Sequence, residues 1–191
     1  MANQDVEIEV KFPLNNQEAV RSFLNQNAEK ISEHVRQKDV YYTPIQRHFL
    51  KYQYPFEWLR LRTSNKGLFI TYKHFHPENS HITDYCDEFE TKVDSIEIME
   101  KIFAAIDIKE VATIDKSRST WVFENVEIVI DEVKELGVFM ELECNGHFDD
   151  AKVGKTHLYF VLKKLGAHVG EEDLRGYPYM LLAKKGYKFG E

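Results

Sequence analysis

The chain has 191 residues and a formal net charge of −7; 43% of its residues are hydrophobic and 30% are charged. This composition excludes a wholly disordered chain, and the length favours one domain covering residues 1–191. No apolar run reaches the ~20 residues that cross a bilayer, and an acidic chain is a poor partner for nucleic acid. With only two cysteines and no signal-peptide pattern, we expect a cytoplasmic protein with neither a membrane nor a nucleic-acid partner.

The first half of the chain reads as strands with one early helix. Period-two alternation over residues 6–12 predicts a strand with its two acids and its lysine on one face. Residues 16–28 carry apolar side chains at helical spacing, which predicts a helix. Residues 59–62, 69–73 and 88–90 predict further strands. In these strands the polar pairs that share a face are Arg60 with Arg62, Thr71 with Lys73, and Glu88 with Glu90.

Three helices are predicted in the second half. The first opens at a capping box in which Asp94 is the cap. The second covers residues 149–165, turns Val153 inward and ends at Gly166. The third is short and begins near Pro178.

The strands of the second half repeat the same-face pattern. Their pairs are Lys116 with Arg118, Val129 with Asp131, and Glu141 with Glu143. Most connections between strands are short, which favours antiparallel pairing. Together with the helices, this predicts an α+β fold in which helices pack against an antiparallel sheet.

The charged faces have a plain interpretation, because antiparallel sheets commonly have one wet face. Here, however, like charges lie two residues apart, and a passive surface gains nothing from that repulsion. Bound counter-ions would offset it, since carboxylates bind hard divalent cations and Lys and Arg bind phosphate oxygens. The pattern therefore favours a metal–polyphosphate site. The charged faces would line a lumen if the sheet curls into a barrel, although a flat sheet has the same pattern.

A series of motifs in chain order resembles the CYTH superfamily, the triphosphate tunnel metalloenzymes. The first is E-x-E-x-K at Glu7-Ile-Glu9-Val-Lys11, a weak motif by itself. Those that follow are Lys38-Asp-Val-Tyr-Tyr42, Glu57-Trp-Leu-Arg-Leu-Arg62, Thr71-Tyr-Lys73, Glu88-Phe-Glu90, Lys116-Ser-Arg118, Asp131-Glu-Val-Lys-Glu-Leu-Gly137 with Phe139-Met-Glu-Leu-Glu143, and Gly176-Tyr-Pro-Tyr-Met-Leu181. Because the similarity runs in order along nearly the whole chain, the chain is identified as a member of this superfamily.

The resemblance implies an antiparallel, eight-stranded β-barrel or tunnel with a polar lumen and flanking helices, and Mg²⁺ or Mn²⁺ as cofactor. The implied metal ligands are Glu7, Glu9, Asp131, Glu141 and Glu143. The implied triphosphate-binding residues are Lys11, Arg60, Arg62, Lys73, Lys116 and Arg118. Within these sets, Glu7, Glu9, Lys11 and Glu141 are the implied catalytic residues. Glu88 and Glu90 either belong to the metal shell or orient the bases.

The chain also departs from the superfamily pattern at two places. Tyr85-Cys-Asp87 stands where an arginine is common, and Gly176 replaces the terminal serine. Neither departure removes a metal or phosphate position.

Within the superfamily, the chain most resembles the class IV adenylyl cyclases, which convert ATP to cyclic AMP and pyrophosphate. The alternative is a triphosphatase that hydrolyses thiamine triphosphate, inorganic tripolyphosphate or a nucleoside triphosphate with nearly the same charges. A non-catalytic polyphosphate- or nucleotide-binding protein is a third hypothesis, and a homodimer stays open. Recognition of the nucleobase would separate a cyclase from a tripolyphosphatase. A cyclase must hold adenine and place the ribose 3′-hydroxyl in line with the α-phosphorus, whereas a tripolyphosphatase needs no such pocket.

Three other signals are set aside. An aromatic group at Phe49, Tyr54, Phe56 and Trp58 is more typical of packing than of base stacking. Gly154-Lys-Thr156 lacks the first glycine of a P-loop and lies in a helical pattern. The histidines between residues 74 and 81 lie in a polar loop or long hairpin without a clear fourth ligand, so we expect no transition-metal site there.

Overall fold

The computed structural model describes residues 6–145 and 151–190, without the side chains of Val6, Glu7 and Ala151. The chain divides into two compact units. The first is built around Arg36–Asp115 and Arg175–Glu191, and the second comprises Glu7–Val35 and Lys116–Leu174. The expectation of a single domain over residues 1–191 stays a prediction.

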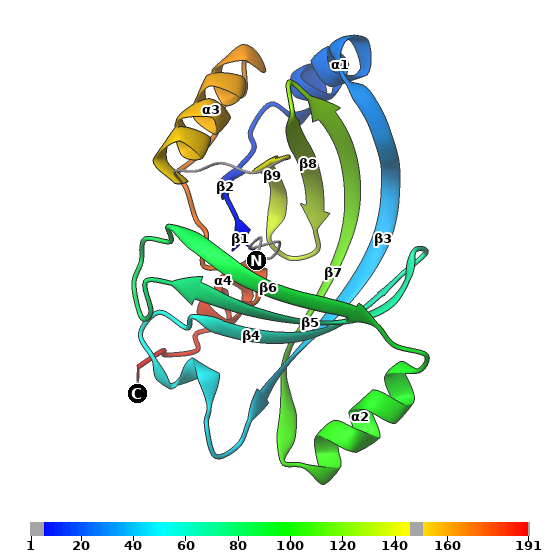
Figure 1. Cartoon of the computed structure of the whole chain (residues 1–191), viewed down its shortest axis with the longest axis vertical. Coiled ribbons are helices and arrows are strands. Elements are labelled where there is room, and N and C mark those ends of the chain that lie inside the picture. Colours follow the sequence, from blue (N-terminus) through cyan, green and yellow to red (C-terminus); the bar gives the residue numbers. More distant parts are fainter. Residues whose placement is uncertain (1–5, 146–150, 191) are drawn as a thin grey trace, which may run out of the picture. The chain divides into compact units, whose positions relative to one another are not determined.

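The strands of the described ranges form one sheet, with the order β1-β6-β5-β4-β3-β7-β8-β9-β2 (Figure 1). Their bounds are Val6–Glu7 (β1), Glu9–Pro13 (β2), Glu29–Pro44 (β3), Glu57–Ser64 (β4), Gly67–His76 (β5), Tyr85–Lys92 (β6), Ile108–Phe123 (β7), Val126–Val133 (β8) and Gly137–Cys144 (β9). The predicted amino-terminal strand is interrupted at Ile8, so β1 and β2 are two pieces of one segment. If these pieces are counted together, the predicted α+β fold with eight antiparallel strands and flanking helices is confirmed.

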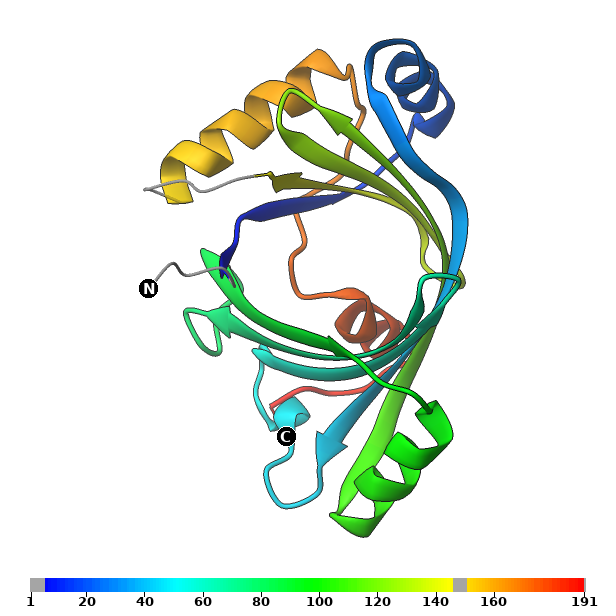
Figure 2. The same ribbon diagram turned by 45° about the vertical axis from the view of Figure 1, so that its right-hand side comes forward.

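The core of the second unit lies on one face of β2, β9, β8 and β7. Register aligns Val10 with Leu142, Leu142 with Ile128 and Ile128 with Trp121, and all four side chains are fully buried. They pack in one cluster with residues of α1 (Gln17–Asn27) and α3 (Ala151–Lys164) (Figure 2). Because side chains alternate along a strand, the residues between these apolar positions point to the opposite face.

The two helices of the second unit are those expected, with one correction; the predicted start of the second at residues 149–150 lies outside the described residues. Val20 and Leu24 of α1 are buried, and so are Leu158 and Val161 of α3. Val153, predicted to point inward, is 59% exposed. The reason is the neighbouring Gly154: a Cβ there would lie 3.0 Å from Ile8 Cδ1, so this face of the helix packs on the residue between β1 and β2 and turns Val153 outward.

The first unit has a smaller core beneath α2 (Ile96–Ala105). The ring of Phe103 packs edge-to-face on Tyr42, with centroids 5.0 Å apart, in a cluster that includes Leu61. The predicted cap of this helix is wrong by one residue, because the Oγ of Ser95, and not Asp94, accepts a hydrogen bond from the Ile98 N–H at 3.2 Å.

The short helix predicted near Pro178 is present as α4, which covers Tyr177–Lys184. A 3₁₀ turn over Phe49–Lys51 (η1) was not predicted. The polar segment 74–87 is a long hairpin between β5 and β6. No helix in the described ranges is both long and apolar enough to cross a bilayer.

Candidate functional site

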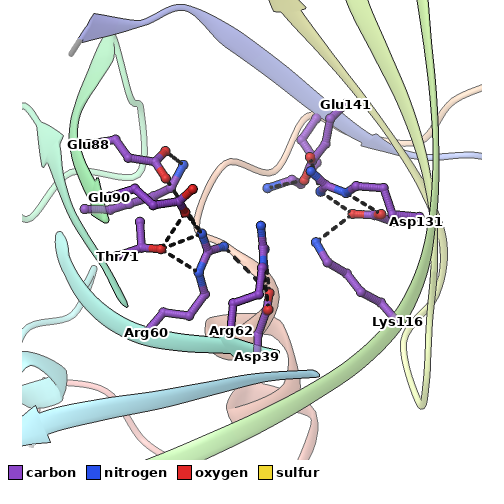
Figure 3. A network of polar contacts seen from close by, with 12 residues as sticks. Asp39, Arg60, Arg62, Thr71, Glu88, Glu90, Lys116, Asp131 and Glu141 are labelled. Carbon is purple, nitrogen blue, oxygen red and sulfur yellow. Dashed lines mark hydrogen bonds and ion pairs between the residues drawn. The ribbon is translucent and has the colours of Figure 1, made fainter. Parts of the chain in front are cut away.

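In the first unit, strand register brings the predicted bases together with acids on one sheet face. Arg62 in β4 is aligned with Asp39 in β3, and Arg60 is aligned with Thr71 in β5. Thr71 is aligned in turn with Glu90 in β6. We call the following residues the Asp39 cluster: Asp39, Arg60, Arg62, Thr71, Lys73, Glu88 and Glu90 (Figure 3).

The centre of the Asp39 cluster is a forked ion pair. Arg62 donates from Nε to Oδ1 and from Nη2 to Oδ2 of Asp39, both at 2.7 Å. Arg60 Nη1 lies 3.6 Å from the same Oδ2. Asp39 is fully buried, and such bidentate pairs fix the plane of a guanidinium group. Asp39 therefore holds the orientation of Arg62.

The outer part of the cluster ties the bases to β6. Arg60 Nη2 donates to the Thr71 hydroxyl at 2.9 Å, and that hydroxyl donates to Glu90 Oε2 at 2.8 Å. Lys73 forms an ion pair with Glu88. Burial would lower the pKa of the Arg60 guanidinium, but Asp39 and the nearby acids outweigh burial and raise it. Glu88 and Glu90 thus contact the predicted phosphate-binding bases.

The second unit carries its own charged network, which we call the Asp131 cluster: Lys11, Lys116, Arg118, Asp131 and Glu141 (Figure 3). Arg118 Nε and Nη2 lie 2.8 and 2.6 Å from the two oxygens of Asp131. Lys116 Nζ lies 3.0 Å from Asp131 Oδ2. Arg118 Nη2 also donates to Glu141 Oε2 at 2.7 Å, and Lys11 Nζ lies 3.0 Å from Glu141 Oε1. These residues come from β2, β7, β8 and β9.

The two carboxylates of the Asp131 cluster are held in their ionised form. Burial by itself would raise the pKa of Asp131, but Arg118 and Lys116 outweigh it and hold the pKa below its usual value. Glu141 is also buried, and Lys11 together with Arg118 lowers its pKa well below its usual value. Both groups are therefore anionic oxygen donors at neutral pH.

A row of acids lies beside the Asp131 cluster. Glu9 in β2 is aligned with Glu143 in β9, and Glu143 is aligned with Glu127 in β8. Like charges directly opposite each other are destabilising. Glu127 was not predicted as a site residue, because it lies outside the motifs that resemble the superfamily. Glu7 lies in β1, and its side chain is outside the described residues.

The carboxylates that the structure describes are not gathered into a metal site. Among the side chains that the structure describes, no group of three or more His, Cys, Asp or Glu could hold a metal ion. Asp131 and Glu141 face lysine and arginine, as described above. Their donor chemistry nevertheless fits a hard divalent cation, since they offer anionic oxygens beside a row of acids whose mutual repulsion a cation would offset.

The like-charge pairs also have partners within the chain. Neighbouring strands place acids against bases, so that Asp39 lies against Arg62, and Asp131 lies against Arg118. Asp39 and Thr71 were not predicted as site residues. The motif around Asp39 signalled its position, but its role depends on the pairing of β3 with β4.

The signals set aside from the sequence behave as expected. Phe49, Phe56 and Trp58 are buried, and Trp58 packs edge-to-face on Tyr41 with centroids 5.8 Å apart. The Nε1 of Trp58 has no hydrogen-bond partner within the described ranges. Gly154 lies inside α3, so no P-loop forms.

The histidines of the β5–β6 hairpin contact one another and an acid of the same hairpin. His74 and His76 stack with ring centroids 4.5 Å apart, and His76 contacts Asp87 at 2.8 Å. They belong to no metal-binding group among the described side chains.

Comparison with known proteins identifies the family of the chain. The CYTH domain matches residues 5–177, which includes the residues of both clusters. The chain belongs to the CYTH family. Members of this family are metal-dependent triphosphate tunnel enzymes, and the fold described above is consistent with that tunnel fold.

Individual relatives extend this assignment. A protein of Methanocaldococcus jannaschii named "Putative adenylate cyclase" is 33% identical over 138 residues, which cover 72% of this chain and 76% of that protein. A solved structure from Pyrococcus horikoshii has a TM-score of 0.77 at 27% identity, and covers 93% of this chain and 99% of its own. A Hippeastrum structure, described as a "Putative adenylyl cyclase" with a dominant triphosphatase activity, has a TM-score of 0.61 at 16% identity over 96% of each chain. At that identity the last likeness concerns the fold alone.

Proposed function

We propose that this CYTH protein is a divalent-metal-dependent enzyme that acts on a triphosphate. The observation that carries the proposal is the burial of basic side chains on the charged sheet faces. Lys11, Arg60 and Lys116 are each less than 10% exposed. A passive wet face keeps such groups in water, because burying a charge is costly. Buried bases at fixed positions instead suit a bound polyanion.

The Asp39 cluster supplies the proposed triphosphate contacts Arg60, Arg62 and Lys73. Arg62 already presents its guanidinium in a fixed plane, since both of its bonds to Asp39 lie at one edge. Guanidinium groups bind phosphate oxygens through the same forked geometry. Glu88 and Glu90 orient Lys73 and Arg60 in this proposal. Lys11, Lys116 and Arg118 of the Asp131 cluster are the remaining proposed contacts.

The proposed ligands of Mg²⁺ or Mn²⁺ are Glu7, Glu9, Asp131, Glu141 and Glu143. When bound, the cation would neutralise phosphate charge and lower the pKa of the attacking hydroxyl group or water. The chain prepares its ligands by keeping Asp131 and Glu141 ionised despite their burial. Lys11 and Arg118 hold Glu141 in place, and they stabilise the charge that shifts toward the leaving group. Glu7, Glu9, Lys11 and Glu141 are the proposed catalytic residues.

Adenylyl cyclase activity is the reaction that we favour within this class, with ATP converted to cyclic AMP and pyrophosphate. Its support is the resemblance to class IV cyclases and the name of the Methanocaldococcus jannaschii relative. The second candidate is hydrolysis of a triphosphate, because the triphosphatases that the chain resembles use nearly the same set of charges. The charged clusters described above serve either reaction.

Product analysis separates these reactions. The purified protein is incubated with Mg²⁺ or Mn²⁺ and, separately, with ATP, thiamine triphosphate and tripolyphosphate, and the products are identified by chromatography. Cyclic AMP with pyrophosphate selects the cyclase, and phosphate with a diphosphate selects the hydrolase. Binding without any product would refute the enzymatic proposal and favour a nucleotide- or polyphosphate-binding protein.

A matched pair of variants tests the assigned residues. Glu141→Gln removes the buried charge between Lys11 and Arg118, so we expect turnover to fall at least 100-fold while the circular dichroism spectrum is kept. Glu29→Gln changes an exposed glutamate at the start of β3 and serves as the control. Equal activities of the two variants would contradict the assignment of Glu141.

A further inference from the structure

The side-chain oxygen of a buried glutamine on the charged face of the first unit has no hydrogen-bond partner among the described residues. Gln37 lies in β3, two residues before Asp39 and therefore on the same face, and its register partner in β4 is Ser64. Gln37 is only 7% exposed. Its Oε1 accepts no hydrogen bond from any residue that the structure describes. Buried polar groups are normally satisfied, so a partner for this oxygen must come from beyond the described residues.

An aromatic ring lies at the same end of the face. Phe69 in β5 is half-buried and aligned with Arg62. Its ring leans over Gly67, because a Cβ at Gly67 would lie 3.5 Å from Phe69 Cε2. Gly67 is aligned with Ser64, so the ring leans toward the row of residues that contains Gln37.

An amide and an aromatic ring together suit a nucleobase. A glutamine side chain presents an acceptor beside a donor, which matches the exocyclic amino group and the adjacent ring nitrogen of adenine. An aromatic ring offers a stacking surface to any base. Arg62 and then Arg60 follow Ser64 at every second residue of β4 on the same face. A nucleotide whose nucleobase contacts Gln37 would therefore have its phosphates near these two arginines.

We infer that Gln37 binds the base edge of a nucleoside triphosphate that carries an amino group beside a ring nitrogen, as adenine does, with Phe69 as the adjoining ring. This inference rests on the proposed function and deepens it, because a base-free polyphosphate has no use for the amide. The Oε1 atom of Gln37 is buried in this structure. A ligand can bind it after the amide group rotates about the terminal side-chain torsion, and this rotation is easy because that torsion has a broad energy minimum.

The test compares two ligands on one variant. Gln37→Met keeps the length of the side chain and removes its polar atoms. Binding of ATP and of tripolyphosphate is measured by calorimetry with Ca²⁺ as the cation, and chromatography verifies that each ligand stays intact. We expect the Kd of ATP to rise about tenfold, which is ~1.4 kcal/mol, and the Kd of tripolyphosphate to change less than twofold.

A matched control comes from the other unit. Gln17 in α1 also has a buried Oε1 without a partner among the described residues, but it lies outside the charged clusters. Gln17→Met should leave both Kd values unchanged. A second measurement needs no variant: the parent should bind purine riboside 5′-triphosphate, which lacks the amino group, several-fold more weakly than ATP. Gln37→Met should reduce that difference.

The outcomes separate the inference from the proposed function. If Gln37→Met weakens both ligands equally or neither, while the parent binds both, the inference is wrong and the proposed function stands. Equal affinity of the parent for ATP and for the amino-free analogue also overturns the inference. If the parent binds neither ATP nor tripolyphosphate, the proposed function fails and the inference fails with it.

Discussion

Replacing Asp131 by asparagine removes the buried negative charge on which the Asp131 cluster depends. The carboxylate is fully buried and contacts Lys116 at 3.0 Å and Arg118 at 2.8 and 2.6 Å. Asparagine keeps one acceptor oxygen, but its amide nitrogen donates where Arg118 or Lys116 also donates. Asp131→Asn therefore leaves the buried Lys116 and the partly buried Arg118 insufficiently paired.

Removing one partner of a buried ion pair typically costs about 3–5 kcal/mol. That is a large part of the ~5–15 kcal/mol by which proteins are normally stable. For a chain of this size, each kcal/mol lowers the melting temperature by about 2–4 °C, so we expect a loss of about 6–20 °C. The assay is thermal unfolding followed by circular dichroism at pH 7, with parent and variant at equal concentration.

The adjacent residue provides the control. Glu132 points to the opposite face of β8 and pairs with Arg21 at 2.9 Å, and its side chain is 43% exposed. Exposed pairs contribute about 0–1 kcal/mol, so Glu132→Gln should lower the melting temperature by a few degrees at most. If Asp131→Asn melts within 2 °C of the parent, or no lower than Glu132→Gln, the assigned role of the buried charge is refuted.

Three further predictions concern acid sensitivity, phosphate binding and thiol reactivity. First, the free energy of unfolding should fall as the pH drops below about 4–5. The pKa values of Asp131 and Glu141 are lowered in the folded state, so their contribution is complete above their unfolded values and is lost as both groups are protonated; denaturant titrations across this pH range measure the loss. Second, Arg62→Lys should weaken tripolyphosphate binding about tenfold in calorimetry, because lysine cannot reproduce the forked contact with Asp39. Third, Cys144 should resist iodoacetamide at pH 8 in the folded protein. Burial, and to a smaller extent the negative charge of Glu143, raise the pKa of its thiol to about 11.

Each of these predictions has its own contrary result. A pH slope of Asp131→Asn equal to that of the parent would remove Asp131 from the acid-sensitive set. Arg47 is the control for the arginine variant, because its side chain is 63% exposed and pairs with Glu57 outside the Asp39 cluster. Arg47→Lys should leave binding unchanged, and equal losses in both variants would argue against the forked contact. Rapid labelling of Cys144 before unfolding, detected by peptide mass spectrometry, would contradict its burial.

The two sides of the sheet were predictable from the sequence, because side chains on a strand alternate with a period of two residues. The alternation places Glu141 and Lys11 on a polar face and Val10 and Leu142 on an apolar one, and the structure has them so. The helices around the apolar face were predictable for a similar reason, since their buried residues recur at helical spacing. Motif order along the chain also indicated the CYTH family.

Only the tertiary structure decided which charges meet. Alternation assigns a residue to a face, but it does not say which residue of a distant strand lies opposite, because register depends on the pairing of whole strands. The forked pair of Arg62 with Asp39, and the place of Asp131 between Lys116 and Arg118, follow from such pairings across sequence gaps. The outward turn of Val153 was decided in the same way, by contact of its neighbour Gly154 with the distant Ile8 between β1 and β2.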